Sequence, residues 1–230
     1  MKHRFYNKNK NERNQIQIII ALSALTIILT SLFLSWKTGT YIIGMLTFPI
    51  VLSIIAPFFD TPALKKNGKL FYYSSLFIAE QPKNEIITIH GGTLLDYFFV
   101  IDRKMNGKQR TNFIIQKYLQ GVLCLIEKYE DTKKTNLKIC GTSYIINVRT
   151  AEKLGFKIKK TDFLQKMILT YNYFNLLISN SIAKNKISFP NLKKTRTFEA
   201  DLNQLIERKT YIIELNNKLK STITNTVYKT

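Results

Sequence analysis

The residues best suited to bind an anion lie in the segment 102–115, which reads DRKMNGKQRTNFII. Basic side chains surround an Asn106–Gly107 bend, and a long helix is expected to begin directly after it. Free amides at a helix start, together with the positive end of its dipole, attract phosphate groups. The alternative is a set of basic side chains that only face water. The expected phosphate cradle consists of Asn106, Gly107, Lys108, Gln109, Arg110 and Thr111.

Few side chains in the sequence could transfer a proton. The chain has two His, and His90 stands just before a Gly91–Gly92 turn, with Asp96 a few residues further on in an apolar run. Both side chains could act as a general base for an incoming nucleophile, and Tyr97 or Tyr144 could protonate a leaving group. A turn histidine and a structurally paired carboxylate are the alternatives. The candidate catalytic residues are Asp96, His90 and Tyr144.

Several other kinds of chemistry are not expected. The sequence contains no GxxxxGK[ST], GxGxxG, HExxH or GxSxG motif. Two Cys cannot form a disulfide scaffold, and no ligand cluster predicts a metal site. The balance of 35 Lys+Arg against 15 Asp+Glu gives a net charge of +20, which suits nucleic acid or an anionic membrane. Because no nucleic-acid-binding signature is present, nucleic acid is not an expected partner.

Two uncharged, strongly apolar stretches lie near the N-terminus, at 14–36 and 38–59. Each exceeds the roughly 20 residues that a helix needs to cross about 30 Å of hydrocarbon. A cleaved signal peptide is the alternative for the first stretch, but its long apolar core and the second stretch directly after it argue against one. We therefore expect a transmembrane helical hairpin over 16–60, integral to the lipid bilayer and preceded by a basic tail over 1–15.

Basic residues indicate the orientation of this hairpin. The tail before it and the segment after it are rich in Lys and Arg, whereas Lys37 is the single charge in the connecting loop. The positive-inside bias then puts both termini on the cytoplasmic side of a cell inner membrane. The anionic lipids of the inner leaflet are a further expected partner of the basic domain. In that compartment Cys124 and Cys140 would remain reduced.

The segment 61–160 predicts an α/β (α+β) domain with a mixed sheet, because strand-like and helix-like patterns alternate along it. Aromatic and aliphatic runs separated by turn signals predict an antiparallel meander. An amphipathic helix follows, then a short buried strand, a helix capped by Thr142 or Ser143 and ended by Gly155, and a further strand. The expected strands are 69–80, 85–90, 93–101, 137–141 and 156–160, and the expected helices are 108–130 and 142–154.

The segment 161–230 is expected to be a helical C-terminal part. A helix over 162–184 either packs on the sheet or lies at the membrane surface, because its three Asn make a third span unfavourable. Pro190 interrupts the chain, and Thr197 can cap a final helix. The apolar residues over 198–219 have heptad-like spacing, so this helix either docks on the domain or forms a homodimer.

The segment 137–156, LKICGTSYIINVRTAEKLGF, resembles the last conserved part of the GNAT acyltransferase superfamily. The resemblance covers about residues 69–160. It implies acetyl-CoA or another acyl-CoA as cofactor, with residues 106–111 around the pyrophosphate and the helix ending in LGF beside the pantetheine arm. The loop departs from the family form [QR]xxGx[GA] because Gly107 is its only glycine, and Ala151 stands where many members have a tyrosine.

Together with the expected hairpin, the resemblance implies a membrane-anchored cytoplasmic GNAT-like domain that transfers an acyl group from acyl-CoA to an amine. The acceptor would be a small amine or a protein associated with the membrane. The alternative is a non-catalytic, membrane-tethered binding module that acts through its basic surface or its C-terminal helix.

Overall fold

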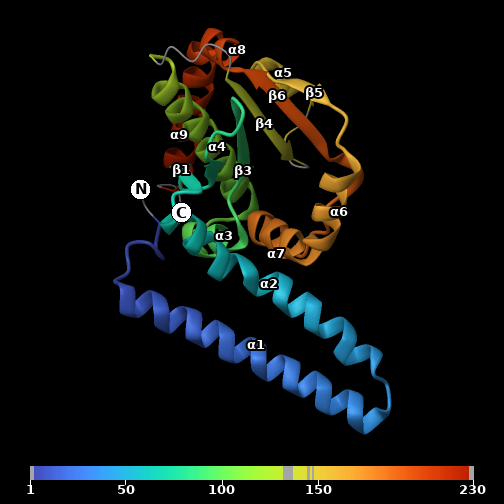
Figure 1. Cartoon of the computed structure of the whole chain (residues 1–230). Helices are drawn as coiled ribbons and strands as arrows, with labels where there is room; N and C mark the ends of the chain where they lie inside the picture. The colour runs from blue at the N-terminus through green and yellow to red at the C-terminus, as the bar shows by residue number, and fades with distance from the viewer. Residues whose placement is uncertain (1–2, 132–136, 144–145, 147, 228–230) are drawn as a thin grey trace.

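The computed structural model describes residues 3–131, 137–143, 146 and 148–227. Two long helices, α1 (Lys10–Thr38) and α2 (Ile42–Lys66), run antiparallel beneath an α/β domain (Figure 1). Both are long and apolar enough to cross a membrane, and 17% and 22% of their most apolar windows are buried. Most of their apolar side chains are therefore exposed, unlike those of a core helix.

Local structure defines where α1 begins and ends, and a hydrogen bond joins α1 to α2. Asn9 and Glu12 form a capping box that starts α1, and Gly39, with φ of 66°, ends it in the left-handed conformation. The amide of Gly44 in the first turn of α2 donates to Ser35 Oγ at 2.8 Å. This bond satisfies one of the free amides at the start of α2 and ties it to α1.

Six strands among the described residues form one mixed sheet with the order β1-β2-β3-β4-β6-β5. β3 and β4 are parallel, and the other neighbouring strands are antiparallel. The sheet therefore confirms the predicted mixed α/β architecture. Its strands are β1 (Leu70–Ser74), β2 (Phe77–Glu80), β3 (Ile86–Gly91), β4 (Lys138–Ser143), β5 (Lys157–Lys159) and β6 (Arg196–Asp201).

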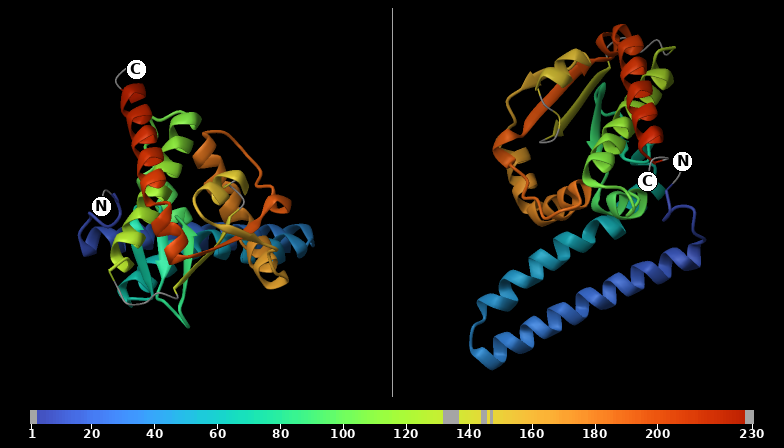
Figure 2. Two further views of the ribbon diagram at one scale, coloured as in Figure 1. Left: turned by 90° about the horizontal axis from the view of Figure 1, so that it is seen from above. Right: turned by 180° about the vertical axis from the view of Figure 1, so that it is seen from behind.

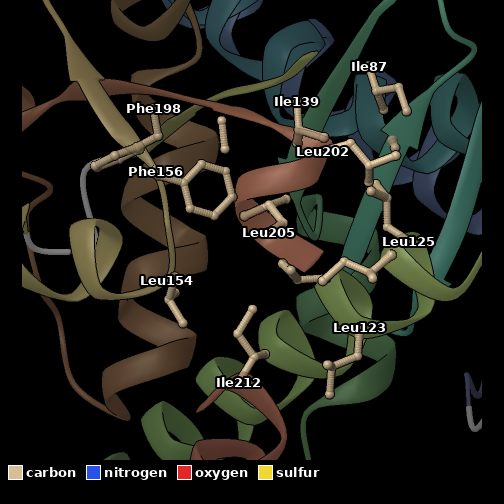
Figure 3. Close-up of a cluster of buried hydrophobic side chains, with 14 of the residues drawn as sticks. Ile87, Leu123, Leu125, Ile139, Leu154, Phe156, Phe198, Leu202, Leu205 and Ile212 are labelled. Carbon is tan, nitrogen blue, oxygen red and sulfur yellow. The ribbon is translucent and has the colours of Figure 1, made fainter. Parts of the chain in front are cut away.

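One face of the sheet carries the main core. The long helices α4 (Gly107–Tyr129) and α9 (Lys209–Val227) lie side by side over this face (Figure 2). The short helix α8 (Leu202–Glu207) packs beside them, and α5 (Val148–Lys153) contributes Ala151 to the same core. Side chains from strands and helices interlock there, including Ile87, Ile139, Phe156, Phe198, Leu205 and Ile212 (Figure 3).

Three further helices gather at the end of the sheet nearest the hairpin (Figure 1). They are α3 (Leu94–Val100), α6 (Phe163–Tyr171) and α7 (Tyr173–Lys184). Both α3 and α7 contact α2, and a 3₁₀ turn over Leu192–Lys194 contacts α6. The domain thus rests on α2 through these helices, from its middle to its last turns.

The predicted meander is wrong in two places. Residues 69–80 form two strands, β1 and β2, because the chain turns at Ser75 and Leu76. Residues 93–101 are not a strand, because Thr93 and Asp96 form a capping box that starts α3. Asp96 therefore lies in the first turn of a helix. The strand predicted at 85–90 and the helix predicted at 108–130 are confirmed as β3 and α4.

The C-terminal prediction is also corrected. Residues 162–184 form α6 and α7, which meet at Asn172, and Thr197 lies inside β6 rather than at a helix cap. Asp201 and Gln204 form the capping box that starts α8. The predicted strands at 156–160 and 137–141 are confirmed as β5 and β4. The predicted helix over 142–154 is wrong at its start, because Thr142 and Ser143 belong to β4 and α5 begins at Val148.

The heptad-like residues over 198–219 contribute to the domain's own core. Phe198 belongs to β6, while Leu202 and Leu205 belong to α8 and Ile212 to α9, so they do not share one helix. All four are buried, and Leu219 packs against the same cluster. Docking on the domain, the alternative to a dimer, is the arrangement observed.

Candidate functional site

The parallel strands β3 and β4 separate at their carboxyl ends. Their mutual pairing ends at Ile89 and Gly141. Beyond this point β3 stays paired with β2 as far as Gly91, and β4 stays paired with β6 as far as Ser143. The strands therefore diverge (Figure 1), and their main-chain edges from Ile89 to Gly91 and from Gly141 to Ser143 are not paired with each other beyond Ile89 and Gly141.

A cleft of about 480 Å³ opens between the diverging strands. Tyr118, Leu119 and Val122 of α4 line one wall, and the carboxyl ends of β3 and β4 line another. Most of its surface is apolar, as in most small-molecule sites. The end nearest the hairpin is closed by side chains of α2, α6 and α7, which include Thr61, Leu64, Ile168, Asn172, Asn175 and Leu176.

Two glycines allow the close approaches that shape this cleft. A Cβ on Gly141 would lie 2.7 Å from Ile89 Cγ1 and 2.9 Å from the Ile89 carbonyl oxygen, so the strands can meet at the base of the cleft only with glycine there. A Cβ on Gly91 would collide with the hydroxyl of Tyr118. That phenol therefore lies directly against the backbone at the end of β3.

His90, a predicted candidate, lines the cleft and is paired with Glu80, which sequence reasoning missed. His90 Nε2 lies 2.9 Å from Glu80 Oε1, and both residues belong to the cleft lining. Glu80 is on β2, and the antiparallel pairing with β3 brings it next to His90. A carboxylate that holds one imidazole nitrogen leaves the other free to accept a proton, which is the arrangement of an oriented general base.

Two phenols also meet at the cleft. The hydroxyl oxygens of Tyr97 and Tyr118 are 3.2 Å apart, and both residues line the cleft. Burial raises the pKa of Tyr118, while the bond with Tyr97 lowers it by less. Tyr118 therefore keeps its proton at neutral pH and can donate it. The sequence singled out Tyr97 for this chemistry but gave no signal for Tyr118.

Asp96 is not among the described residues that line the cleft. Its carboxylate accepts from Tyr72 Oη at 2.6 Å and from the Thr93 amide at 2.6 Å, and it pairs with His3 Nε2 at 2.9 Å. Both Asp96 and His3 are fully buried. With a further bond from Thr93 Oγ1 at 2.9 Å, the carboxylate is occupied by structural partners within the domain.

The Asp96 cluster joins the N-terminal tail to the domain. Burial, followed by the Asp96 carboxylate, raises the pKa of Tyr72, and burial raises the pKa of Tyr6 to about 12. The two phenols therefore remain protonated, and their oxygens lie 3.3 Å apart. Lys65 Nζ sits 3.5 Å above the Tyr6 ring. The sequence predicts no role for His3, because nothing local in the tail points to a partner 93 residues away.

The expected phosphate cradle forms the first turns of α4, as predicted, and its polar side chains stabilise the helix itself. Asn106 accepts from the Gln109 amide at 3.0 Å, and Gln109 Oε1 accepts from the Asn106 amide at 2.7 Å. Thr111 Oγ1 donates to the Gly107 carbonyl. The side of Gly107 that lacks a Cβ faces the Lys184 carbonyl at the end of α7. Lys108 is exposed beside this turn.

Arg110 is buried rather than turned toward solvent. Its guanidinium donates to the carbonyls of Met105, Ile182 and Arg103 at 2.8, 2.8 and 2.9 Å. The side chain therefore closes the loop before α4 and joins it to α7. The cations that remain exposed around this turn are Arg103, Lys104 and Lys108.

Tyr144 lies outside the described residues, whereas Ser143, which precedes it, lines the cleft. Within the described part of the chain, no group of three His, Cys, Asp or Glu residues could hold a metal ion. The structure thus brings His90 and Tyr97 to one cleft, and it holds Asp96 and the 106–111 turn in separate intrachain contacts. In comparisons with known proteins, no family model, no curated protein and no solved structure matches this chain.

Proposed function

We propose that this chain is a membrane-anchored, acyl-CoA-dependent acyltransferase whose cleft between β3 and β4 receives the pantetheine arm. The observation that carries the proposal is the divergence of the two parallel strands beyond Ile89 and Gly141. A pantetheine arm is an extended chain with two amides. It could enter between the strands and bond to their unpaired edges, as a peptide does when it adds to a sheet.

The order of elements around the cleft supports the GNAT resemblance. β3 leads through α3 to the long helix α4, then to the parallel strand β4, the short helix α5 and the strand β5. This matches the strand, long helix, strand, helix and strand order that the resemblance predicts, except that the helix α3 stands where a strand is expected directly before the loop. Gly155, with φ of 96°, ends α5 within the LGF sequence, and Leu154 and Phe156 line the cleft.

The hairpin supplies the anchoring in this proposal. α1 and α2 would cross the bilayer, with the basic tail, Lys65 and Lys66 on the cytoplasmic side of an inner membrane. The cleft would then lie just beyond the hydrocarbon region, because its lining includes Pro57, Thr61 and Leu64 from the last turns of α2. An amine on a membrane-associated acceptor could reach it there.

The transfer requires one proton acceptor and one proton donor. The acceptor amine attacks the thioester carbonyl, so a carbon–nitrogen bond forms and the carbon–sulfur bond breaks. His90, oriented by Glu80, would take the proton from the amine, and Tyr118 or Tyr97 would give a proton to the CoA thiolate. The products are the amide and CoA. We assign the CoA phosphates to Arg103, Lys104 and Lys108 around the start of α4.

A binding measurement on the full chain in detergent micelles tests this proposal. Calorimetry should show saturable acetyl-CoA binding that unlabelled CoA competes away. Leu176→Trp should abolish the binding, because Leu176 lines the cleft and a tryptophan would fill it. Leu177→Trp, one residue further along α7 and outside the lining, is the matched control and should bind normally. Absence of binding by the unaltered chain would refute the proposal.

The second candidate is a non-catalytic membrane-tethered module, and the contacts at the start of α4 favour it. There the Asn106 and Gln109 side chains cap the helix and Gly107 faces the Lys184 carbonyl, so little of the turn remains for a pyrophosphate. This candidate predicts that His90→Gln leaves the protein's cellular role intact. The acyltransferase proposal predicts instead that His90→Gln abolishes turnover but leaves the affinity for acyl-CoA unchanged.

A further inference from the structure

The short helix α6 has three chemically different faces. Gln165 and Ile168 line the cleft, whereas Lys166 and Thr170 line a second pocket of about 670 Å³. The remaining face carries apolar side chains that line neither space. At 100° per residue these three sets occupy separate arcs of the helix. α6 therefore separates the two pockets, and its third face is exposed on the surface of the domain.

The outward face of α6 is strongly apolar and exposed. Exposed fractions are 78% for Phe163, 63% for Leu164, 54% for Met167 and 64% for Tyr171. A contiguous exposed apolar face of this kind is uncommon on a soluble surface and marks a contact with a membrane or a partner. α6 leads directly into α7, which contacts α2, so this face lies on the part of the domain that packs next to the hairpin (Figure 1).

The second pocket is basic, and no acidic residue is among those that line it. Lys159 of β5 is held by Glu199 at 2.6 Å, but its neighbours Lys160, Lys166 and Lys193 converge on the space without a carboxylate partner in the described structure. Its remaining lining consists of Ile158, Thr161, Leu169, Thr170, Leu192, Thr195 and Arg196.

Thr195 provides an independent sign of a ligand in this pocket. It is 96% buried, and its hydroxyl has no hydrogen-bond partner among the residues that the structure describes. A buried hydroxyl without a partner is unfavourable unless a ligand or water satisfies it. An anionic oxygen in the pocket would accept from Thr195 Oγ1 and neutralise the surrounding lysines.

We propose that the pocket between α6, β5 and the Leu192–Lys194 turn binds the phosphate of an anionic phospholipid, while the outer face of α6 lies in the bilayer interface. A phosphate fits a cluster of lysines with a buried hydroxyl donor. A free phosphate compound has the same chemistry, but the apolar face of α6 beside the pocket favours a lipid, whose acyl chains would lie against it. The inference rests on the proposed membrane anchoring.

The test uses the fluorescence of single tryptophans, because Trp36 in α1 is the only tryptophan in the chain. The double variant Trp36→Phe, Phe163→Trp carries the α6 probe, and Trp36→Phe, Tyr211→Trp carries the α9 probe as a control. Full-length proteins are reconstituted in phosphatidylcholine vesicles with a minor fraction of brominated phosphatidylcholine or brominated phosphatidylglycerol. Bromine quenches only tryptophans within the bilayer.

We expect the α6 probe to be quenched and the α9 probe to remain unquenched. At equal bulk fractions, brominated phosphatidylglycerol should quench the α6 probe more strongly than brominated phosphatidylcholine, by an amount equivalent to an enrichment of at least about fivefold near α6. This factor corresponds to the attraction of one lysine to an anionic surface. Lys160→Glu with Lys193→Glu should remove this preference, whereas Lys153→Glu with Lys218→Glu, an equal charge change outside the pocket, should retain most of it. Thr195→Val should reduce the preference without lowering the melting temperature.

Each contrary outcome has a separate meaning. Quenching of Trp36 in the unaltered chain without quenching of the α6 probe would overturn the inference and leave the anchoring intact. Loss of quenching at both Trp36 and the α6 probe would refute the anchoring as well. If soluble CoA or inorganic phosphate abolishes the phosphatidylglycerol preference, the pocket binds a soluble phosphate compound and the lipid assignment is wrong. Equal effects of the two charge-reversal pairs would show a general charge effect and no site.

Discussion

The side-chain amide of Asn175 in α7 donates to the backbone carbonyl of Ser53 in α2 at 2.6 Å. Pro57 has no amide hydrogen, so the Ser53 carbonyl lacks the donor that a helix would otherwise supply from four residues ahead. Pro62 leaves the Phe58 carbonyl in the same situation, and Gln17 Nε2 of α1 donates to it at 2.8 Å. Two prolines in α2 thus create acceptors that neighbouring helices satisfy.

Replacing Asn175 should therefore destabilise the protein in a way that depends on Pro57. Asn175→Leu leaves the Ser53 carbonyl without a donor and should lower the free energy of unfolding by about 1–3 kcal/mol. In a Pro57→Ala background the new amide of residue 57 restores the helical bond, so the same substitution should cost less. Denaturant unfolding of the four proteins in micelles measures this cycle. An equal cost in both backgrounds would show that the bond to Ser53 is unimportant.

The Asp96 cluster should matter for stability rather than for catalysis. Asp96→Asn puts an amide where the carboxylate accepts from the Thr93 amide and from Tyr72, and should cost about 3 kcal/mol of unfolding free energy. Asp102→Asn is the matched control, because Asp102 is exposed and accepts only from the Lys104 amide in a turn. Asp102→Asn should change stability by less than about 1 kcal/mol. Similar losses for both variants would contradict the structural role of Asp96.

Gly121 allows α4 to pack closely against the sheet. A Cβ at this position would overlap the Phe77 side chain of β2. Gly121→Ala should therefore lower the unfolding free energy by about 1–3 kcal/mol, even though alanine favours a helix. Phe77→Leu should be less harmful in the Gly121→Ala background than alone, because the smaller side chain leaves room for the added methyl. Thermal unfolding of the single and double variants gives the comparison.

Cys140 should react slowly with alkylating reagents at neutral pH. Burial, and then the Glu199 carboxylate, raises the pKa of its thiol. The thiolate is the reactive form, so the midpoint of a rate–pH profile should lie above the value of about 8.5 for free cysteine. The measurement uses iodoacetamide on a Cys124→Ser background. Adding Glu199→Gln should move the midpoint toward lower pH, and a midpoint below that of free cysteine would contradict the structure.

Strong local patterns predicted much of this fold. The hairpin stretches are long and uncharged, and α4 has a sustained helical period, so neither depends on distant partners for its identity. The apolar run over 93–101 fits a strand and a buried helix equally well, and only the T-x-x-D spacing of Thr93 and Asp96 separates the two. The local pattern over 196–201 favours a helix start, although these residues pair with β4 and β5 along most of their length.

The site was less accessible to sequence reasoning, because its contacts are not local. His90 could be proposed from its residue type, but its partner Glu80 comes next to it only through the register of β2 and β3. The divergence of β3 and β4 depends on a pairing between segments about fifty residues apart, as Ile89 and Gly141 illustrate. The pattern over 106–111 correctly predicted the start of a long helix, yet gave no sign of the Asn106–Gln109 capping box or of α7 lying against it.

The buried pair of His3 and Asp96 has a consequence for the proposal that the hairpin of α1 and α2 crosses a bilayer. In the sequence these residues flank the entire hairpin, so their contact closes a ring that contains both apolar helices. The ring can close only when an even number of crossings returns the chain to its starting side. If only one of the two helices crossed the bilayer, His3 and the Asp96 carboxylate would lie on opposite sides of it and could not pair. The native contact would thus verify membrane topology, and a misinserted chain would lack it.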